Sequence, residues 1–325
     1  MLLKMLKFFA LVTGFFILMF VLFVSLVFYS NIGFFRDIRE LYVETAMTTM
    51  NHQYLAKMFI SKREIDRIMG KSAAFEQQQQ DKTDVKVIKL DTDESKEENK
   101  DIEVVDISAA TYKGKLLIVE DPSRVKLSVS KRILKFGEKL DTLISNENAI
   151  GGINASGFSD PEGKGNGGVP VGIVIKDGDI IYSDKLAVYP IVGFNYDNVL
   201  VLGRYKKNDI MSLNLRDAVS FSPFLIVNGQ PQITSGDGGW GIQPRTAIGQ
   251  TKDGKVLMLV IDGRQLSSIG VTLKTLQDIM LEHGAYNAAN LDGGSSTVMY
   301  YMGSLLNKPC SMYGERFLPN AFVVK

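Results

Sequence analysis

The most apolar part of the chain lies near its N-terminus, where residues 8–29 carry no charged side chain. A helix over this stretch is long enough to cross a bilayer. Lys4 and Lys7 precede it, whereas Arg36 and Asp37 are mixed in the segment that follows, so the lysines favour a cytoplasmic N-terminus. A signal peptide is the alternative, but the stretch exceeds the usual signal-peptide core and no small-residue cleavage motif follows it. The pattern therefore predicts a single-pass anchor in the cell membrane, with the C-terminal body outside. Cys310 is the only cysteine, so no internal disulfide is possible, and an anchored outer domain without disulfides is typical of a bacterial envelope protein.

Two segments of different character follow this apolar stretch. Residues 31–75 contain no proline and favour one or two helices near the membrane. Residues 76–106 form an acidic, low-complexity tract, which is typical of a solvated linker, although binding of a cation or a basic partner is an alternative. We therefore predict four parts: the cytoplasmic N-terminus and transmembrane anchor (1–30), a membrane-proximal helical segment (31–75), an acidic linker (76–106) and one globular domain (107–325).

The globular part shows many short strand patterns and few helical ones. Two strands are expected around an Asp-Pro turn within residues 112–130, and a hairpin around Asp177-Gly178 within residues 171–182. Clear helical patterns occur only near residues 136–145 and 272–283. This balance predicts an α+β fold, a single sheet-rich domain.

One segment of this domain reads as strand, helix, strand. Residues 256–261 form an apolar run that ends at Asp262, and residues 286–291 form a second strand pattern that ends at Asp292. A connection of this length, with a helix over 272–283, joins parallel neighbours. Both strands would then end at the same edge of the sheet. We expect Asp262 and Asp292 to face one pocket there.

A glycine- and serine-rich loop follows the second strand. Gly293 and Gly294 can present successive backbone N–H groups to an anion, and Ser295 and Ser296 add hydroxyl donors. Phosphate is the anion that such a loop is expected to bind. A tight turn into the next strand would use the same residues, so both interpretations stay open.

Two arginines and one asparagine are further candidates. Arg245 begins a strand pattern and Arg264 follows Asp262 closely; each could clamp a phosphate or form an ordinary ion pair. Asn154, at the end of another strand pattern, offers a donor and an acceptor to a sugar or phosphate, or caps its own turn. The glycine-rich segment 159–168 that follows is longer than usual connections, which favours a binding lid.

The two predicted carboxylates are compatible with more than one kind of chemistry. Two carboxylates at one edge are the groups a glycosyl transfer needs. They would also suit Ca²⁺ or Mg²⁺, so a divalent cation remains an alternative although the sequence requires no cofactor. Zinc is disfavoured because Cys310 is the only cysteine and no pair of closely spaced histidines occurs. The net charge of +1, without a basic cluster in the body, predicts no nucleic-acid partner. The oligomeric state cannot be predicted.

Five blocks of sequence, in order, are similar to those of a known family. They are GINASGF, VPVGIVIKDG, PRTAIGQTKDG, the segment from residue 260 to 297, and ERFLPNAFVV. Together they resemble the phosphodiester glycosidase domain family, to which the lysosomal "uncovering" enzyme and bacterial exopolysaccharide-related proteins belong. The resemblance covers roughly residues 107–325. It implies site roles for Asn154, Arg245, Asp262, Arg264, Asp292 and Arg316, with Gly293, Gly294 and Ser295 as the anion loop.

The resemblance implies hydrolysis of a sugar-1-phosphodiester at the anomeric carbon. For an anchored bacterial protein, the expected substrate class is a phosphorylated glycan of the cell envelope. Two alternatives remain at this point. One is a non-catalytic binding or assembly protein for phosphorylated exopolysaccharide or teichoic acid, and the other is a metal-dependent phosphodiesterase that cuts the P–O bond.

Overall fold

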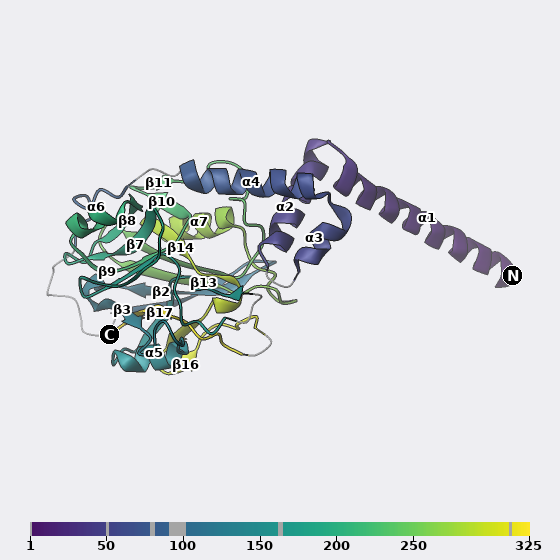
Figure 1. Cartoon of the computed structure of the whole chain (residues 1–325). Helices are drawn as coiled ribbons and strands as arrows, with labels where there is room; N and C mark the ends of the chain where they lie inside the picture. Colours follow the sequence, from purple (N-terminus) through teal and green to yellow (C-terminus); the bar gives the residue numbers. More distant parts are fainter. Residues whose placement is uncertain (1, 50–51, 79–81, 91–101, 162–164, 312–313) are drawn as a thin grey trace.

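The computed structural model describes residues 2–49, 52–78, 82–90, 102–161, 165–311 and 314–325. Figure 1 shows the long helix α1 (Leu2–Tyr29) extending away from the body of the molecule, with three shorter helices at the junction. Within Lys4–Tyr29, an 18-residue window of α1 has a mean hydropathy of 2.8 and is only 6% buried, so the helix is long and apolar enough to cross a membrane.

The membrane-proximal segment forms three helices, not the one or two predicted. They are α2 (Gly33–Met47), α3 (Gln53–Phe59) and α4 (Lys62–Gln78). The prediction missed the break before α4, where the Ser61 hydroxyl accepts a hydrogen bond from the backbone N–H of Glu64 at 3.3 Å, as an N-cap does. Their common core contains Val43, Ala56, Ile60 and Ile68.

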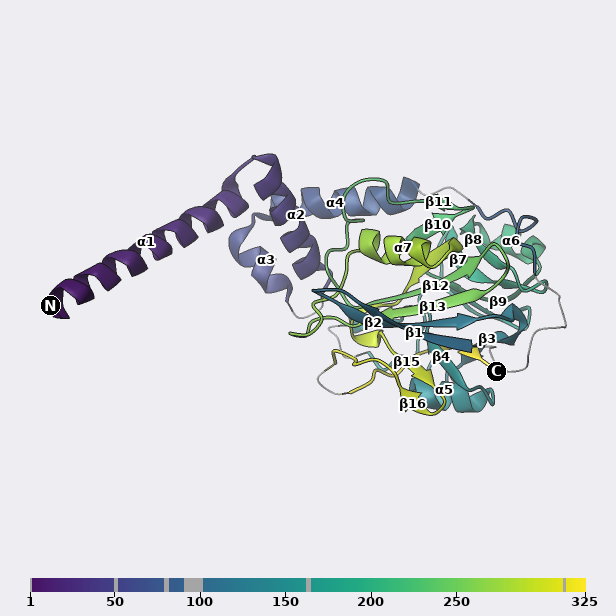
Figure 2. The same cartoon turned by 180° about the vertical axis from the view of Figure 1, so that it is seen from behind.

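The described residues of the globular domain form three antiparallel sheets, and the predicted sheet-rich α+β class is confirmed. Figures 1 and 2 show that strands make up most of this body. The seven-stranded sheet has the order β1 (Ile102–Ser108), β2 (Lys113–Val119), β13 (Val256–Ile261), β12 (Arg245–Thr251), β14 (Ala285–Leu291), β10 (Phe224–Val227) and β11 (Gln230–Pro231). One five-stranded sheet has the order β16 (Ser304–Leu305), β15 (Met299–Tyr301), β4 (Gly151–Asn154), β17 (Asn320–Val324) and β3 (Val125–Val129). The other has the order β6 (Asp179–Ser183), β5 (Ile173–Lys176), β9 (Leu215–Ser220), β7 (Tyr189–Asn195) and β8 (Leu200–Tyr205).

Helices and apolar side chains fill the spaces around these sheets. Among the described residues, the helices of the domain are α5 (Leu140–Asn146), α6 (Lys207–Ile210) and α7 (Leu273–Glu282), with short 3₁₀ turns at Pro122–Arg124, Met211–Leu213 and Gly294–Ser296. The largest core joins side chains of all three sheets, among them Met258, Phe322 and Phe194. On the other face of the seven-stranded sheet, α7 buries the apolar stripe that its sequence predicts, which consists of Leu273, Leu276, Ile279 and Met280.

The predicted strand–helix–strand unit forms, but its two strands are not neighbours. β12 lies between β13 and β14 and pairs antiparallel with both. The prediction failed because β12 precedes the unit in sequence, and local periodicity does not reveal which strands pair. β13 and β14 still run in the same direction and end at one edge of the sheet, as expected.

The predicted boundary between linker and domain is wrong. β1 begins at Ile102 and pairs along its length with β2, so residue 107 lies inside a strand. Residues 82–90 also lie against the domain, where the backbone N–H groups of Thr83 and Lys89 donate to the carbonyls of Leu202 and Lys252. The acidic composition predicted a solvated linker. It could not predict these contacts, because backbone groups can form hydrogen bonds whatever the polarity of the side chains. Residues 91–101, in the middle of the predicted linker, lie outside the described residues.

Candidate active site

Three strands bring the predicted site residues to one edge of the seven-stranded sheet. Arg245, the first residue of β12, pairs with Ile261 of β13, and Thr246 pairs with Leu291 of β14. The start of β12 therefore lies between the two strand ends that lead into Asp262 and Asp292.

The loop after β14 is held on both sides by backbone hydrogen bonds. The N–H of Asp292 donates to Ala155 of the segment after β4 at 3.1 Å, and the N–H of Gly294 donates to Pro244 at 2.9 Å. Gly294 has φ +60°, and a Cβ there would lie 3.4 Å from the guanidinium of Arg264, so glycine suits both the conformation and the space. Asp292, Gly293, Gly294 and Ser295 are all half-buried, so a ligand can reach them.

Asp292 is the most strongly perturbed acid of this loop. Burial raises the pKa of its carboxyl to about 7, against the opposing effects of a hydrogen bond from Ser296 and the positive charge of Arg316. Asp160 adds a further upward contribution through its negative charge. A carboxyl with a pKa near neutrality that faces a partly open loop is suited to act as a base or a nucleophile.

Arg316 joins this loop to the predicted lid. Its Nη1 donates to the Ser295 hydroxyl at 3.2 Å, and its Nη2 forms an ion pair with Asp160 at 2.8 Å and donates to the carbonyl of Gly165 at 3.2 Å. Its guanidinium also lies 5.1 Å from the centre of the Phe158 ring. The segment 159–168 therefore contributes a wall of the site, although residues 162–164 are outside the described residues.

Asn154 is completely buried and forms hydrogen bonds that hold the loop after β14 in place. Its Nδ2 donates to the backbone carbonyl of Asp292, and its Oδ1 accepts hydrogen bonds from the Thr246 hydroxyl at 2.9 Å and the Val298 N–H at 3.1 Å. The sequence predicted that Asn154 contacts the substrate. In the structure its side chain links β4, β12 and the loop after β14, and its amide oxygen already accepts two hydrogen bonds from the protein.

Arg245 and Arg264 differ sharply in exposure. Arg245 is 2% exposed, and its guanidinium donates to the carbonyls of Val271, Trp240 and Gly241. Burial lowers its pKa to about 9. Arg264 is exposed, and it donates through Nε to the side-chain oxygen of Gln243 at 3.0 Å. Arg245 thus holds the 240–241 backbone, whereas Arg264 lies beside Gly294 at the anion loop.

Asp262 lies at the same edge as Asp292 but has separate partners. One oxygen accepts hydrogen bonds from Nδ2 of Asn307 at 3.0 Å and from the backbone N–H of Lys308 at 2.9 Å. Burial raises its pKa, against the effect of these bonds. Among the described residues, Asp262 does not form the ion pair with Arg264 that was one of the two interpretations, and the guanidinium of Arg264 donates to Gln243 instead. Asp262 therefore fixes the segment around residue 307.

The sequence did not mark Asp160 and Gln243 as candidates for this region. Asp160 lies in a glycine-rich loop with no periodic pattern, although the length of that loop was itself a signal. Gln243, at 4% exposure, precedes Pro244 and resembles an ordinary loop residue. Among the described residues, no group of three or more His, Cys, Asp and Glu side chains has an arrangement that could hold a metal ion.

Comparison with known proteins identifies the family of this domain. The phosphodiester glycosidase family model matches residues 147–325, which is more than half of the chain and includes all the predicted site residues. The prophage-derived protein YomE of Bacillus subtilis is 31% identical over 184 residues, a match that covers 52% of this chain and 27% of YomE. The bovine N-acetylglucosamine-1-phosphodiester alpha-N-acetylglucosaminidase is 35% identical over 68 residues, or 21% of this chain and 13% of the enzyme. The chain thus spans less than a third of the length of either relative.

The fold has a counterpart among solved structures. The catalytic domain of the zebrafish N-acetylglucosamine-1-phosphodiester alpha-N-acetylglucosaminidase, auto-inhibited by its pro-peptide, superposes with a TM-score of 0.57 and 22% identity over 69% of this chain and 81% of that domain. At this identity the likeness concerns the fold. The family match confirms the family expected from the five sequence blocks and supports a glycosidase-type function: the chain belongs to the phosphodiester glycosidase family.

Proposed function

We propose that this protein is a membrane-anchored, extracytoplasmic glycosidase that hydrolyses sugar-1-phosphodiester bonds in glycans of the cell envelope. The observation that carries the proposal is the position of Asp292. Its carboxyl, with a pKa of about 7, lies at a half-buried loop that Arg316 contacts on one side and Arg264 on the other.

In the proposed reaction, Asp292 acts at the anomeric carbon and the groups around it act on the phosphate. Ionised Asp292 takes a proton from the water that attacks the anomeric carbon, or attacks that carbon itself to form a glycosyl ester; in the second case water then cleaves the ester, which frees the sugar and the Asp292 carboxylate. The bond between the anomeric carbon and the phosphate oxygen breaks, its electron pair stays on that oxygen, and a phosphomonoester leaves. Arg316, Arg264 and the Ser295 hydroxyl are placed to stabilise the charge of this leaving group, which reduces the need for a general acid.

Asp160 and Gln243 serve as positioning residues in this proposal. Each accepts a hydrogen bond or ion pair from one of the two arginines, at 2.8 Å for Asp160 and 3.0 Å for Gln243. A fixed guanidinium loses less conformational freedom when phosphate binds, so these two acceptors favour tight binding of the transition state.

The anchored location is supported by the end of α1. The ring of Phe28 stacks on Phe59 of α3 at 5.2 Å and contacts Tyr42 of α2 at 5.3 Å. A signal peptide cleaved after this helix would remove one partner of both contacts. We therefore propose that α1 is retained and crosses the cell membrane once.

Product analysis in water enriched in ¹⁸O tests the reaction. The full chain in detergent would be incubated with glycerol esters of several sugar 1-phosphates, and both products weighed by mass spectrometry. Label in the sugar supports C–O cleavage at the anomeric carbon. Label in the phosphate would show a phosphodiesterase, and binding of every ester without turnover would show a binding protein.

The same assay with a chelator tests the remaining cofactor alternative. We propose that the residues described above suffice for catalysis. Turnover should then persist after treatment with EDTA, whereas a loss that Ca²⁺ or Mg²⁺ restores would establish a divalent cation as a cofactor.

A further inference from the structure

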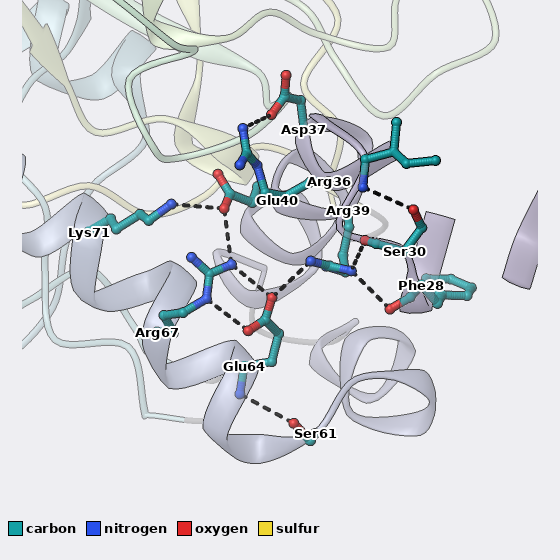
Figure 3. A network of polar contacts seen from close by, with 11 residues as sticks. Phe28, Ser30, Arg36, Asp37, Arg39, Glu40, Ser61, Glu64, Arg67 and Lys71 are labelled. Carbon is teal, nitrogen blue, oxygen red and sulfur yellow. Dashed lines mark hydrogen bonds and ion pairs between the residues drawn. The ribbon is translucent and has the colours of Figure 1, made fainter. Parts of the chain in front are cut away.

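The apolar helix is fixed to the membrane-proximal helices by buried polar contacts. Figure 3 shows Arg39 of α2 donating to the backbone carbonyls of Phe28 at 3.2 Å and Ser30 at 2.9 Å, at the end of α1. The same side chain, 6% exposed, forms an ion pair with Glu64 of α4 at 3.2 Å. Because a buried guanidinium with three partners resists displacement, α1, α2 and α4 form one unit.

The outer side of α4 adds a second set of ion pairs to this unit. Glu40 of α2 accepts from Lys71 at 2.8 Å and from Arg67 at 3.1 Å, and Arg67 also pairs with Glu64 at 2.8 Å. Exposed pairs contribute little individually, but here they share partners with the buried Arg39–Glu64 pair.

This helical unit is docked on the loop that precedes β12. The Thr45 hydroxyl accepts from the N–H of Ile242 at 3.0 Å, and the Thr48 hydroxyl donates to the carbonyl of Trp240 at 3.2 Å. A Cβ on Gly241 would lie 2.4 Å from the backbone nitrogen of Thr45, and one on Gly239 would lie 2.6 Å from the Ser72 hydroxyl. The helices thus approach so closely that only glycine fits at both loop positions.

The docked loop leads directly to the candidate active site. Nε2 of Gln243 donates to the Thr45 carbonyl at 2.9 Å and to the Thr48 hydroxyl at 3.0 Å, while its oxygen accepts from Arg264. The carbonyl of Trp240 accepts from both Thr48 and Arg245. A continuous series of contacts therefore runs from the apolar helix to the arginine beside the anion loop.

Side chains around this junction are those expected at a lipid surface. Large apolar residues are exposed next to the end of α1: Phe34 at 66%, Tyr54 at 55%, Met58 at 67% and Phe59 at 44%. Aromatic and apolar side chains prefer the interface between lipid and water, and these continue the surface of a helix that can span the bilayer. Figures 1 and 2 show α2 and α3 between α1 and the globular domain.

From this series of contacts we infer that the site is held facing the membrane, and that its substrate is a sugar-1-phosphodiester whose other ester carries a lipid embedded in the same bilayer. The inference rests on the proposed function and adds the substrate class. Confinement of enzyme and substrate to one surface raises their effective concentration, but only for a site that is oriented towards that surface. A freely tethered domain would not need helices docked on its active-site loop.

The test compares two substrates with the same scissile bond. The full chain in phospholipid vesicles would be given one sugar 1-phosphate esterified either to glycerol or to a dialkylglycerol inserted in the same vesicles. The inference expects turnover of the lipid ester to exceed that of the soluble ester at least about tenfold at equal total concentration. Equal or slower turnover of the lipid ester would overturn it, whereas no turnover of either ester would instead defeat the proposed function.

A matched pair of insertions tests the role of the docked helices. About twelve glycine and serine residues, with a reach of roughly 20 Å, would be placed between Asn31 and Ile32 or, as the control, after Glu98. The first insertion separates α1 from α2, and the second lengthens the chain between α4 and β1. The preference for the lipid ester should be lost only with the first insertion, while both variants keep their turnover of the soluble ester. Loss with both insertions, or with neither, would overturn the inference.

Discussion

Replacement of Asp292 by asparagine should stabilise the folded protein at neutral pH while it strongly lowers turnover. In the folded chain the pKa of this carboxyl is about 7, against an ordinary value of 3.8. The folded state therefore binds the proton more tightly than the unfolded state does. As the pH rises from about 4 to 7, the unfolded chain gains from ionisation and the folded chain does not, so stability falls over this window.

The size of the effect follows from the pKa difference. About three units at 1.36 kcal/mol each give an upper limit of about 4 kcal/mol. The residue as a whole is half-buried, so solvent near the carboxyl screens part of this cost. We therefore expect Asp292→Asn to unfold with a free energy about 1–2 kcal/mol higher than the native chain at pH 8, and less than half that difference at pH 5.

Trp240, the only tryptophan, provides the signal for this measurement. Its ring lies 6.2 Å from that of Phe221, so its fluorescence reports unfolding of the domain in urea. Turnover of the same variant should fall about 10²–10⁴-fold. Asp262→Asn is the matched control, because its oxygen can still accept from Asn307 and Lys308, and it should keep turnover within about tenfold. Equal stability of Asp292→Asn and the native chain at pH 5 and pH 8 would refute the reasoning.

Three further outcomes are expected. The kcat/KM should rise with pH up to about 7 and then level off, because only ionised Asp292 reacts; a flat profile between pH 5 and 9 would contradict this. Arg316→Lys keeps the charge but cannot contact Asp160 and Ser295 together, so kcat/KM should fall about 10²-fold, and an unchanged value would exclude Arg316 from the site. Gln243→Leu frees Arg264 and should raise KM about tenfold with little change in kcat, the loss of about one hydrogen bond; a fall in kcat alone would argue against this positioning role.

The sequence allowed the ends of β13 and β14 to be placed correctly, since each strand is an apolar run that stops at an aspartate. It did not allow β12 to be placed between them, because pairing depends on contacts between distant segments. Likewise, the sequence marked Asn154 as a polar residue at the end of a strand, but only the structure shows that its buried amide donates to the backbone carbonyl of Asp292.

The sequence did not reveal the contact between α2 and the loop that precedes β12. Thr45 and Thr48 look like ordinary helix-end residues, and the glycines at 239 and 241 look like a flexible turn. Their mutual contact could not be predicted, since close packing of a helix on a distant loop leaves no periodic signal in either segment. The same limit explains why Asp160 was missed as the partner of Arg316.

The hydrogen bonds beneath Asp292 also bear on how the protein reaches its active form. Asn154 and Asp292 are 138 residues apart, and the backbone N–H of Ser156 donates to Asn320 across 164 residues. Contacts between such remote segments form slowly, since a long loop must lose conformational entropy on closing before the contact contributes any stabilisation. Hydrolytic activity should therefore be among the last properties to return during refolding, after secondary structure and after most of the apolar surface has been buried.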